Sequence, residues 1–168
     1  MIENTLFDQL KKRNFQDESI ESLKKASIFV PARPKEVLYD LPRDLSEIED
    51  KMLANFLVNY ENHAGWIRYC ISLREIESEK YKKLLQVGRD MLIKKFSGKA
   101  TEIKSMINSS DDILELEENY LKIMSDLKLM EVTLEHIVNL SKAISREITI
   151  RGFSNEAYPY NRTRVSME

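Results

Sequence analysis

The sequence contains little of what enzymes and metalloproteins commonly use. It has a single cysteine, Cys70, so no disulfide can form within the chain, and we interpret this residue as a structural thiol. Its two histidines, His63 and His136, do not have the spacing to other ligands that metal sites require. The 4 glycines form no phosphate-binding loop. We therefore expect a non-enzymatic protein with no catalytic residues, no metal and no cofactor.

Turn-forming residues and long apolar runs are also scarce. With only 4 glycines and 4 prolines, the chain has few places for tight turns, which favours long helices. No apolar run approaches the roughly 18 residues of a membrane span. The first ten residues lack the basic flank and apolar stretch of a signal peptide. We expect no membrane contact and a cytoplasmic location, which is the host cytoplasm if a phage encodes the protein.

The chain is nevertheless too apolar to be disordered, because 42% of its residues are hydrophobic while 32% are charged. The net charge is −2, so any binding of nucleic acid must depend on a local basic patch.

The clearest pattern predicts a long helix over about 113–152. Its apolar positions alternate spacings of three and four over about five heptads, which is typical of a coiled-coil seam. The seam consists of Ile113, Leu116, Tyr120, Ile123, Leu127, Met130, Leu134, Ile137, Ser141, Ile144 and Ile148. A second apolar set widens this face: Leu114, Leu121, Met124, Leu129, Val132, Val138 and Leu140. We therefore expect the helix to face both a partner helix and another subunit, and to end at Gly152.

A second long helix is predicted over about 46–97. Ser46 and Glu49 have the spacing of a capping box, in which each side chain accepts from the backbone N–H of the other residue. A helically spaced apolar stripe follows, and Ser97-Gly98 ends it. Residues 99–108 predict a short helical turn before the next helix.

The N-terminal part predicts two short amphipathic helices over 3–13 and 17–29, followed by an extended strap over 30–43. Pro31, Pro34 and Pro42 define the strap, because proline disfavours helix at and before its own position. The predicted fold is all-α: a long antiparallel, coiled-coil-like helical hairpin with a small N-terminal helix pair and a proline-containing strap. The expected divisions are 1–45 for the helix pair and strap, 46–152 for the hairpin, and 153–168 for an irregular tail.

Two neighbouring stretches carry opposite charge. Residues 80–104 hold eight basic and two acidic residues, whereas residues 111–135 hold eight acidic and two basic residues. In one interpretation the antiparallel hairpin places them side by side, so that they pair and set the register. In the other interpretation the basic stretch binds phosphate.

The C-terminal end combines arginines with aromatic residues. Arginine pairs with phosphate, and aromatic rings stack on bases, so this composition suits the binding of single strands without sequence preference. The candidate nucleic-acid-binding residues are Lys142, Arg146, Arg151, Phe153, Tyr158, Tyr160, Arg162 and Arg164. The alternative is that the aromatic residues pack on the helices or on another subunit while the arginines remain solvated.

The segment from Leu127 to Phe153 resembles the closing segment of phage recombination mediators of the UvsY type. The matching residues are Ser145, Arg146, Arg151, Gly152 and Phe153. The N-terminal helix pair, the strap and the tail beyond Phe153 depart from that pattern. The resemblance implies a ring-like homo-oligomer that binds single-stranded DNA and helps to load a recombinase onto DNA covered by single-strand binding protein.

Two functional hypotheses follow. The first is a recombination mediator that binds single-stranded DNA. The second is a helical assembly or adaptor module, such as a phage structural component or an inhibitor of a host protein, without affinity for nucleic acid.

Overall fold

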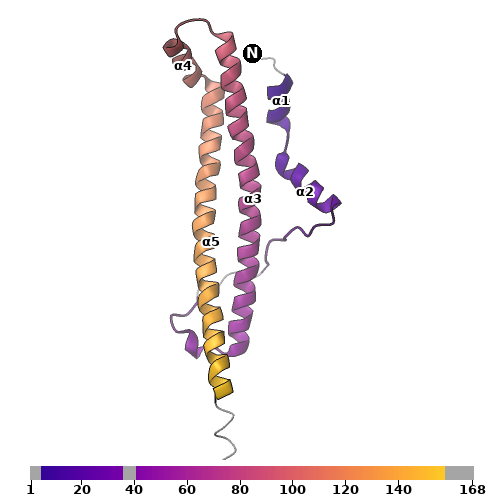
Figure 1. Ribbon diagram of the computed structural model, residues 1–168, viewed down its shortest axis with the longest axis vertical. Coiled ribbons are helices and arrows are strands. Elements are labelled where there is room, and N and C mark those ends of the chain that lie inside the picture. Colours follow the sequence, from indigo (N-terminus) through magenta and orange to yellow (C-terminus); the bar gives the residue numbers. More distant parts are fainter. Residues whose placement is uncertain (1–4, 36–40, 158–168) are drawn as a thin grey trace, which may run out of the picture. The chain divides into compact units, whose positions relative to one another are not determined.

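The computed structural model describes residues 5–35 and 41–157, and this part of the chain is all-α, as predicted, with no strand. The described residues form five α-helices, of which α3 (Asp50–Lys95) and α5 (Asp111–Ala157) are by far the longest and run side by side (Figure 1). The shorter ones are α1 (Thr5–Lys12), α2 (Phe15–Lys25) and α4 (Ala100–Asn108). A 3-10 helix, η1 (Leu45–Glu47), precedes α3.

The chain forms two compact units, each built on a stretch where α3 packs against α5. The first unit contains Met1–Val30 and Tyr69–Glu131, and the second contains Pro31–Arg68 and Val132–Glu168. The late half of α3 therefore pairs with the early half of α5 in the first unit, and the early half of α3 pairs with the late half of α5 in the second. This order confirms the antiparallel hairpin.

In the first unit, the seam of α5 is buried against α3, and α1 covers one side of the pair. Buried side chains come from α1, α3, α4 and α5: Leu10, Leu84, Leu85, Leu92, Ile107, Ile113 and Leu116. Phe7 comes so close to α3 that a Cβ on Gly88 would lie 3.3 Å from its ring and 3.1 Å from Ile113 Cδ1. Glycine at position 88 therefore lets α1 approach the α3–α5 pair.

Polar contacts also hold α1 and α2 on α3. Lys80 Nζ donates to the carbonyl oxygens of Lys11 (3.3 Å) and Arg13 (2.5 Å), and so satisfies acceptors left free at the end of α1. Gln16 donates to the carbonyl of Leu73 (2.9 Å) and to Glu77 (3.1 Å). Both contacts lie within the first unit.

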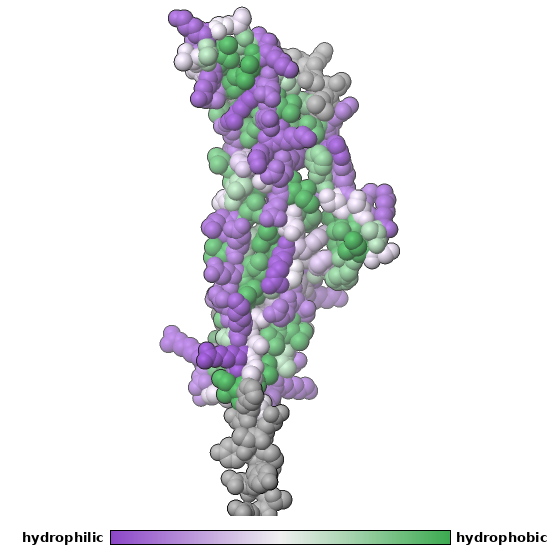
Figure 2. Space-filling model, viewed as in Figure 1, coloured by the Kyte–Doolittle hydropathy of each residue, from purple (hydrophilic) through white to green (hydrophobic). Residues whose placement is uncertain are grey.

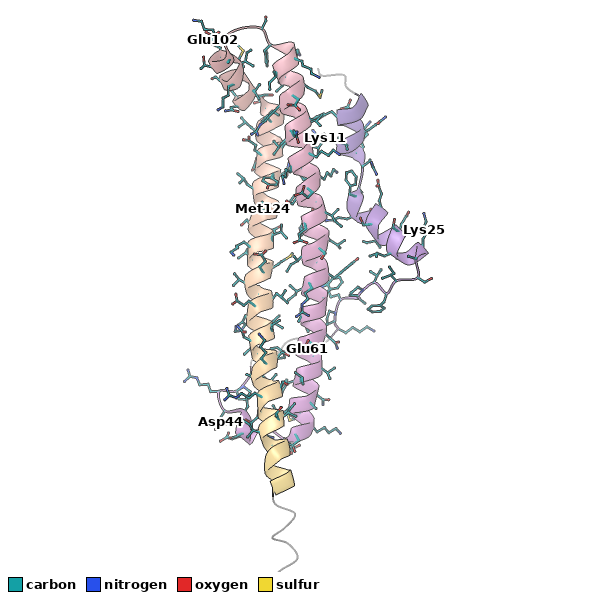
Figure 3. The ribbon with its side chains drawn as sticks, viewed as in Figure 1. Lys11, Lys25, Asp44, Glu61, Glu102 and Met124 are labelled. Carbon is teal, nitrogen blue, oxygen red and sulfur yellow. The ribbon has the colours of Figure 1, made fainter. Side chains whose placement is uncertain are left out.

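In the second unit, the same seam continues with a different set of partners. The buried apolar residues are Leu53, Tyr60, Ala64, Ile137 and Ile144. Ser141, the polar member of the seam, is also buried, and its hydroxyl donates to Glu61 Oε1. Figure 3 labels Glu61 on α3. The hydroxyl is thus satisfied inside an otherwise apolar contact.

Several predicted helix boundaries are wrong. Ser46 and Glu49 do not form a capping box: the Ser46 backbone N–H and hydroxyl both donate to Asp44 (2.9 and 2.6 Å), and α3 begins only at Asp50. Asp44, two residues earlier, engages Ser46 first, as aspartate does in turns. This contact also lowers the pKa of the Asp44 carboxyl, mainly through the Ser46 hydroxyl.

The other errors concern α2 and α5. Helix α2 starts at Phe15, directly after Asn14, whose side chain accepts from Asp17 N. It ends at Lys25, and Ser27, two residues further on, lies in the left-handed region at φ 57°. Helix α5 does not stop at Gly152 but continues to Ala157, so residues 153–157 are helical rather than irregular. Glycine inside a helix costs only about 1 kcal/mol, and nothing at position 152 requires a left-handed conformation.

Replacing Leu127 tests which side of α5 forms the buried seam. Leu127 is 7% exposed and Leu129, on the other side of the same helix, is 65% exposed. We expect Leu127→Ala to lower the free energy of unfolding by about 2–5 kcal/mol, because it removes buried apolar contacts and leaves a cavity. The matched change Leu129→Ala should alter it by less than about 0.5 kcal/mol. Urea denaturation measures both, and equal losses would show that the seam is assigned to the wrong face.

Candidate functional site

Lys142 and Arg146 are the predicted nucleic-acid-binding residues that the structure places at the surface. Both lie on α5 in the second unit, are exposed, and stand four residues apart, so they occupy neighbouring positions on one side of the helix. Neither forms an ion pair with a residue that the structure describes. Two unpaired cations one turn apart can contact consecutive phosphates of a nucleic-acid strand.

Arg151 is instead engaged inside the protein. Its Nε donates to Glu147 Oε1 (2.9 Å), and its Nη1 donates to Asp50 Oδ1 (2.7 Å) and to the carbonyl of Ile48 (2.6 Å). Its Nη2 donates to the carbonyl of Leu45 (2.6 Å). The carboxylates of Asp50 and then Glu147 raise the pKa of the guanidinium, which stays charged. Arg151 thus fastens the turn before α3 to the late part of α5.

The remaining candidate residues cannot be placed with their side chains. Phe153 belongs to α5, but the structure describes only its backbone, and the other four lie outside the described residues: Tyr158, Tyr160, Arg162 and Arg164. Of the predicted set, the structure therefore brings Lys142 and Arg146 together on one surface. The role assigned to the others stays a prediction.

The two oppositely charged stretches pair less than the hairpin hypothesis implies. Within the described residues, Arg89–Glu117 is the one ion pair that joins them. Other acids of α5 use partners outside the basic stretch: Glu115 pairs with Lys11 of α1 (3.8 Å), and Asp126 pairs with Arg74 of α3 (3.4 Å). Much of the charge on α3, α4 and α5 therefore stays available to other molecules.

Helix α5 carries a second apolar face, as its sequence predicted. Leu121 and Leu129 are 66% and 65% exposed, and Leu114, Met124 and Val132 are also exposed. By contrast, Val138 and Leu140 are half-buried and pack against the core of the second unit. Figure 2 shows hydrophobic residues at the surface between hydrophilic ones on the face of the molecule turned to the viewer. Exposed leucines in such numbers on one helix are typical of a protein-binding surface.

Sequence reasoning missed a groove on the first unit. It consists of two hollows of about 710 and 560 Å³, which adjoin because Arg89 and Ile93 line both. The first lies between α3 and α5, and the second between α3 and α4. The i, i+4 spacing of Ile103 and Ile107, on the short helix α4, is the signal that could have indicated it.

Cys70, the one cysteine of the sequence, is half-buried on α3. Burial raises the pKa of the Cys70 thiol, against a smaller lowering effect of Arg74, so the thiol is a weak nucleophile. Across residues 5–35 and 41–157, no three His, Cys, Asp or Glu side chains lie close enough to hold a metal ion. None of the helices described there is long and apolar enough to cross a membrane.

Comparison with known proteins adds no relative: no family model matches the sequence, and neither a curated protein nor a solved structure shows significant similarity to it.

Arg151 and Arg146 allow a matched test, because both lie on the late part of α5 but only Arg151 forms hydrogen bonds with the turn before α3. We expect Arg151→Ala to lower the midpoint of thermal unfolding, because the carbonyls of Leu45 and Ile48 lose their donor. Arg146→Ala, which removes the same side chain from an exposed position, should leave the midpoint unchanged. Circular dichroism at 222 nm measures both. If the two variants have the same midpoint of thermal unfolding, the contacts of Arg151 do not stabilise the second unit.

Proposed function

We propose that this protein is a non-enzymatic helical assembly protein that works as a homo-oligomer. The observation that supports this best is the second apolar face of α5. The first face is buried against α3, whereas Leu114, Leu121 and Leu129 on the outer side are 47%, 66% and 65% exposed. A helix with apolar residues on two sides is stabilised when a second molecule covers the outer side.

The finer part of the proposal is that the oligomer binds single-stranded DNA as a recombination mediator, with a recombinase and a single-strand binding protein as partners. Support comes from the exposed, unpaired Lys142 and Arg146, and from the resemblance of the late part of α5 to mediators of the UvsY type. The net charge of −2 makes one copy a weak ligand for DNA. An oligomer gathers several such cation pairs, so that avidity supplies the affinity that each copy lacks.

A helical assembly or adaptor module without affinity for nucleic acid is the second candidate. Two observations favour it. The guanidinium of Arg151 donates its hydrogen bonds to groups within the protein, and the early part of α5 is strongly acidic. An acidic face repels the phosphate backbone. Both candidates share the oligomer and differ in one measurable property, which is the binding of single strands.

Fluorescence anisotropy of a labelled poly-dT oligonucleotide distinguishes the two candidates. For the mediator we expect salt-dependent binding that is stronger than binding to a duplex of the same length. Lys142→Ala/Arg146→Ala should weaken it and reduce the slope of log K against log salt by about 1.4 for each bound subunit, because two phosphate contacts are lost.

The control for that measurement is Lys24→Ala/Lys25→Ala, which removes two exposed positive charges from α2 and should leave the slope unchanged. Absence of binding at low salt would instead select the assembly module. Binding that survives the change at 142 and 146 would place the DNA site elsewhere on the protein.

A further inference from the structure

Helices α1 and α2, which we call the arm, are held on the first unit by few contacts. Among the described side chains of the arm, Leu10 alone is buried, and Phe7 is half-buried against the same core. Lys80 of α3 donates to two carbonyls at the end of α1. The ion pair between Lys11 and Glu115 joins side chains that are 47% and 61% exposed, and exposed pairs contribute little to stability. A short element with so few buried contacts can open while α3 and α5 stay paired.

The surface under α1 is shaped to receive an aromatic side chain. A Cβ on Gly88 would lie 3.3 Å from the Phe7 ring and 3.1 Å from Ile113 Cδ1, so glycine leaves room for the ring. When the arm opens, this apolar surface meets water, which favours any helix that presents the same pattern. The pattern is a phenylalanine, a leucine three residues on, and a lysine next to it. A second copy of this chain carries it in Phe7, Leu10 and Lys11.

The segment that follows the arm is strained and uncovered. Ser27 has φ 57° and is the one non-glycine residue with positive φ in the described part of the chain. A side chain in that left-handed conformation crowds its own backbone, and an extended conformation relieves the strain. Ile28 and Phe29 come next and are 54% and 82% exposed. Pro31, shortly after them, favours extended chain at the residue before it.

The tether decides which copy an open arm returns to. In an isolated molecule, the chain holds the arm at millimolar effective concentration near its own site, which favours the closed form. In an oligomer, the site of a neighbouring copy is at a comparable concentration and offers the same contacts. The strain at Ser27 then favours the extended connection, and therefore the neighbour's site.

We propose that copies of this chain exchange their arms, so that Phe7 and Leu10 of one copy dock beside Gly88 of the next. This inference rests on the proposed homo-oligomer and specifies one of its contacts. Exchange keeps every contact of the arm and adds a link between copies. Reciprocal exchange closes a dimer, whereas onward exchange from copy to copy closes a ring.

Cross-linking of isotopically mixed protein tests the exchange on the wild-type chain. A carbodiimide joins the Lys11 amine to the Glu115 carboxylate, which lie 3.8 Å apart, and we call the product the arm cross-link. Equal amounts of isotopically light and heavy protein are unfolded, refolded together and coupled. If arms exchange at random between copies, about half of the arm cross-links should join a light peptide to a heavy one. Mass spectrometry measures this share, and protein mixed after the coupling is quenched is the control, with none.

Two variants test the anchors and the hinge. Phe7→Ala/Leu10→Ala should lose the arm cross-link in both its mixed and same-label forms, because the arm no longer docks. The cross-link between Lys128 and Glu131 within α5, whose charged atoms lie 3.6 Å apart, should persist in that variant. Ser27→Gly should lower the mixed share, because glycine adopts φ 57° without strain and so favours the closed arm.

Each part of the proposal can fail separately. If sedimentation velocity shows an oligomer and every arm cross-link is same-label, the exchange is overturned and the homo-oligomer stands. Mixed arm cross-links that survive Phe7→Ala/Leu10→Ala would show random contact between copies and would also overturn it. A mixed share that Ser27→Gly leaves unchanged would overturn the hinge at Ser27. A wild type that is monomeric at all concentrations would overturn both the exchange and the homo-oligomer.

Discussion

The burial of the α5 seam against α3 is the contact on which the rest of the structure depends. In the first unit it places Ile113 and Leu116 against Leu84 and Leu85, and in the second it places Ile137 and Ile144 among Leu53, Tyr60 and Ala64. Apolar residues of α1 and α4 add to this burial in the first unit, and a helix of this length needs such tertiary packing to be stable in water. Once the seam is buried, the direction of every other side chain on α5 follows from its position in the heptad.

That geometric consequence links the fold to function. With one side of α5 committed to α3, Leu114 and Leu121 must point outward, and so must Lys142 and Arg146. The protein thereby displays an acidic, leucine-containing surface on the first unit and a cation pair on the second. Self-association and the binding of a polyanion would use different parts of one helix, so that neither surface has to be given up for the other.

The fold was predictable from the sequence to the extent that it depends on periodicity. The regular spacing from Ile113 to Ile148 indicated the long helix and its buried face, and the added leucines indicated a second face. Helix ends were less predictable, because they depend on competition between local contacts. Asp44 outcompeted Glu49 for Ser46, and Gly152 stayed helical because no turn is required there.

The candidate site was predictable only in part, for a different reason. Composition identifies a charged side chain but not its partners. Arg146 and Arg151 look alike in the sequence, yet the first is exposed and the second reaches the carbonyls of Leu45 and Ile48, more than a hundred residues away in the chain. The groove escaped prediction because its lining comes from three helices, and the spacing within each helix does not show how the three pack together.

Ser141 has a consequence for how the hairpin selects its alignment. A seam made only of aliphatic residues would let two long helices slide past each other by a heptad, or about 10 Å, with little change in apolar contact. Sliding separates the Ser141 hydroxyl from Glu61. The hydroxyl can then donate only to a backbone carbonyl of its own helix. This hydrogen bond, between a buried hydroxyl and a carboxylate at the surface, thus makes the misaligned hairpins less stable than the native one. A single hydroxyl therefore helps to fix the register of two helices of more than forty residues each.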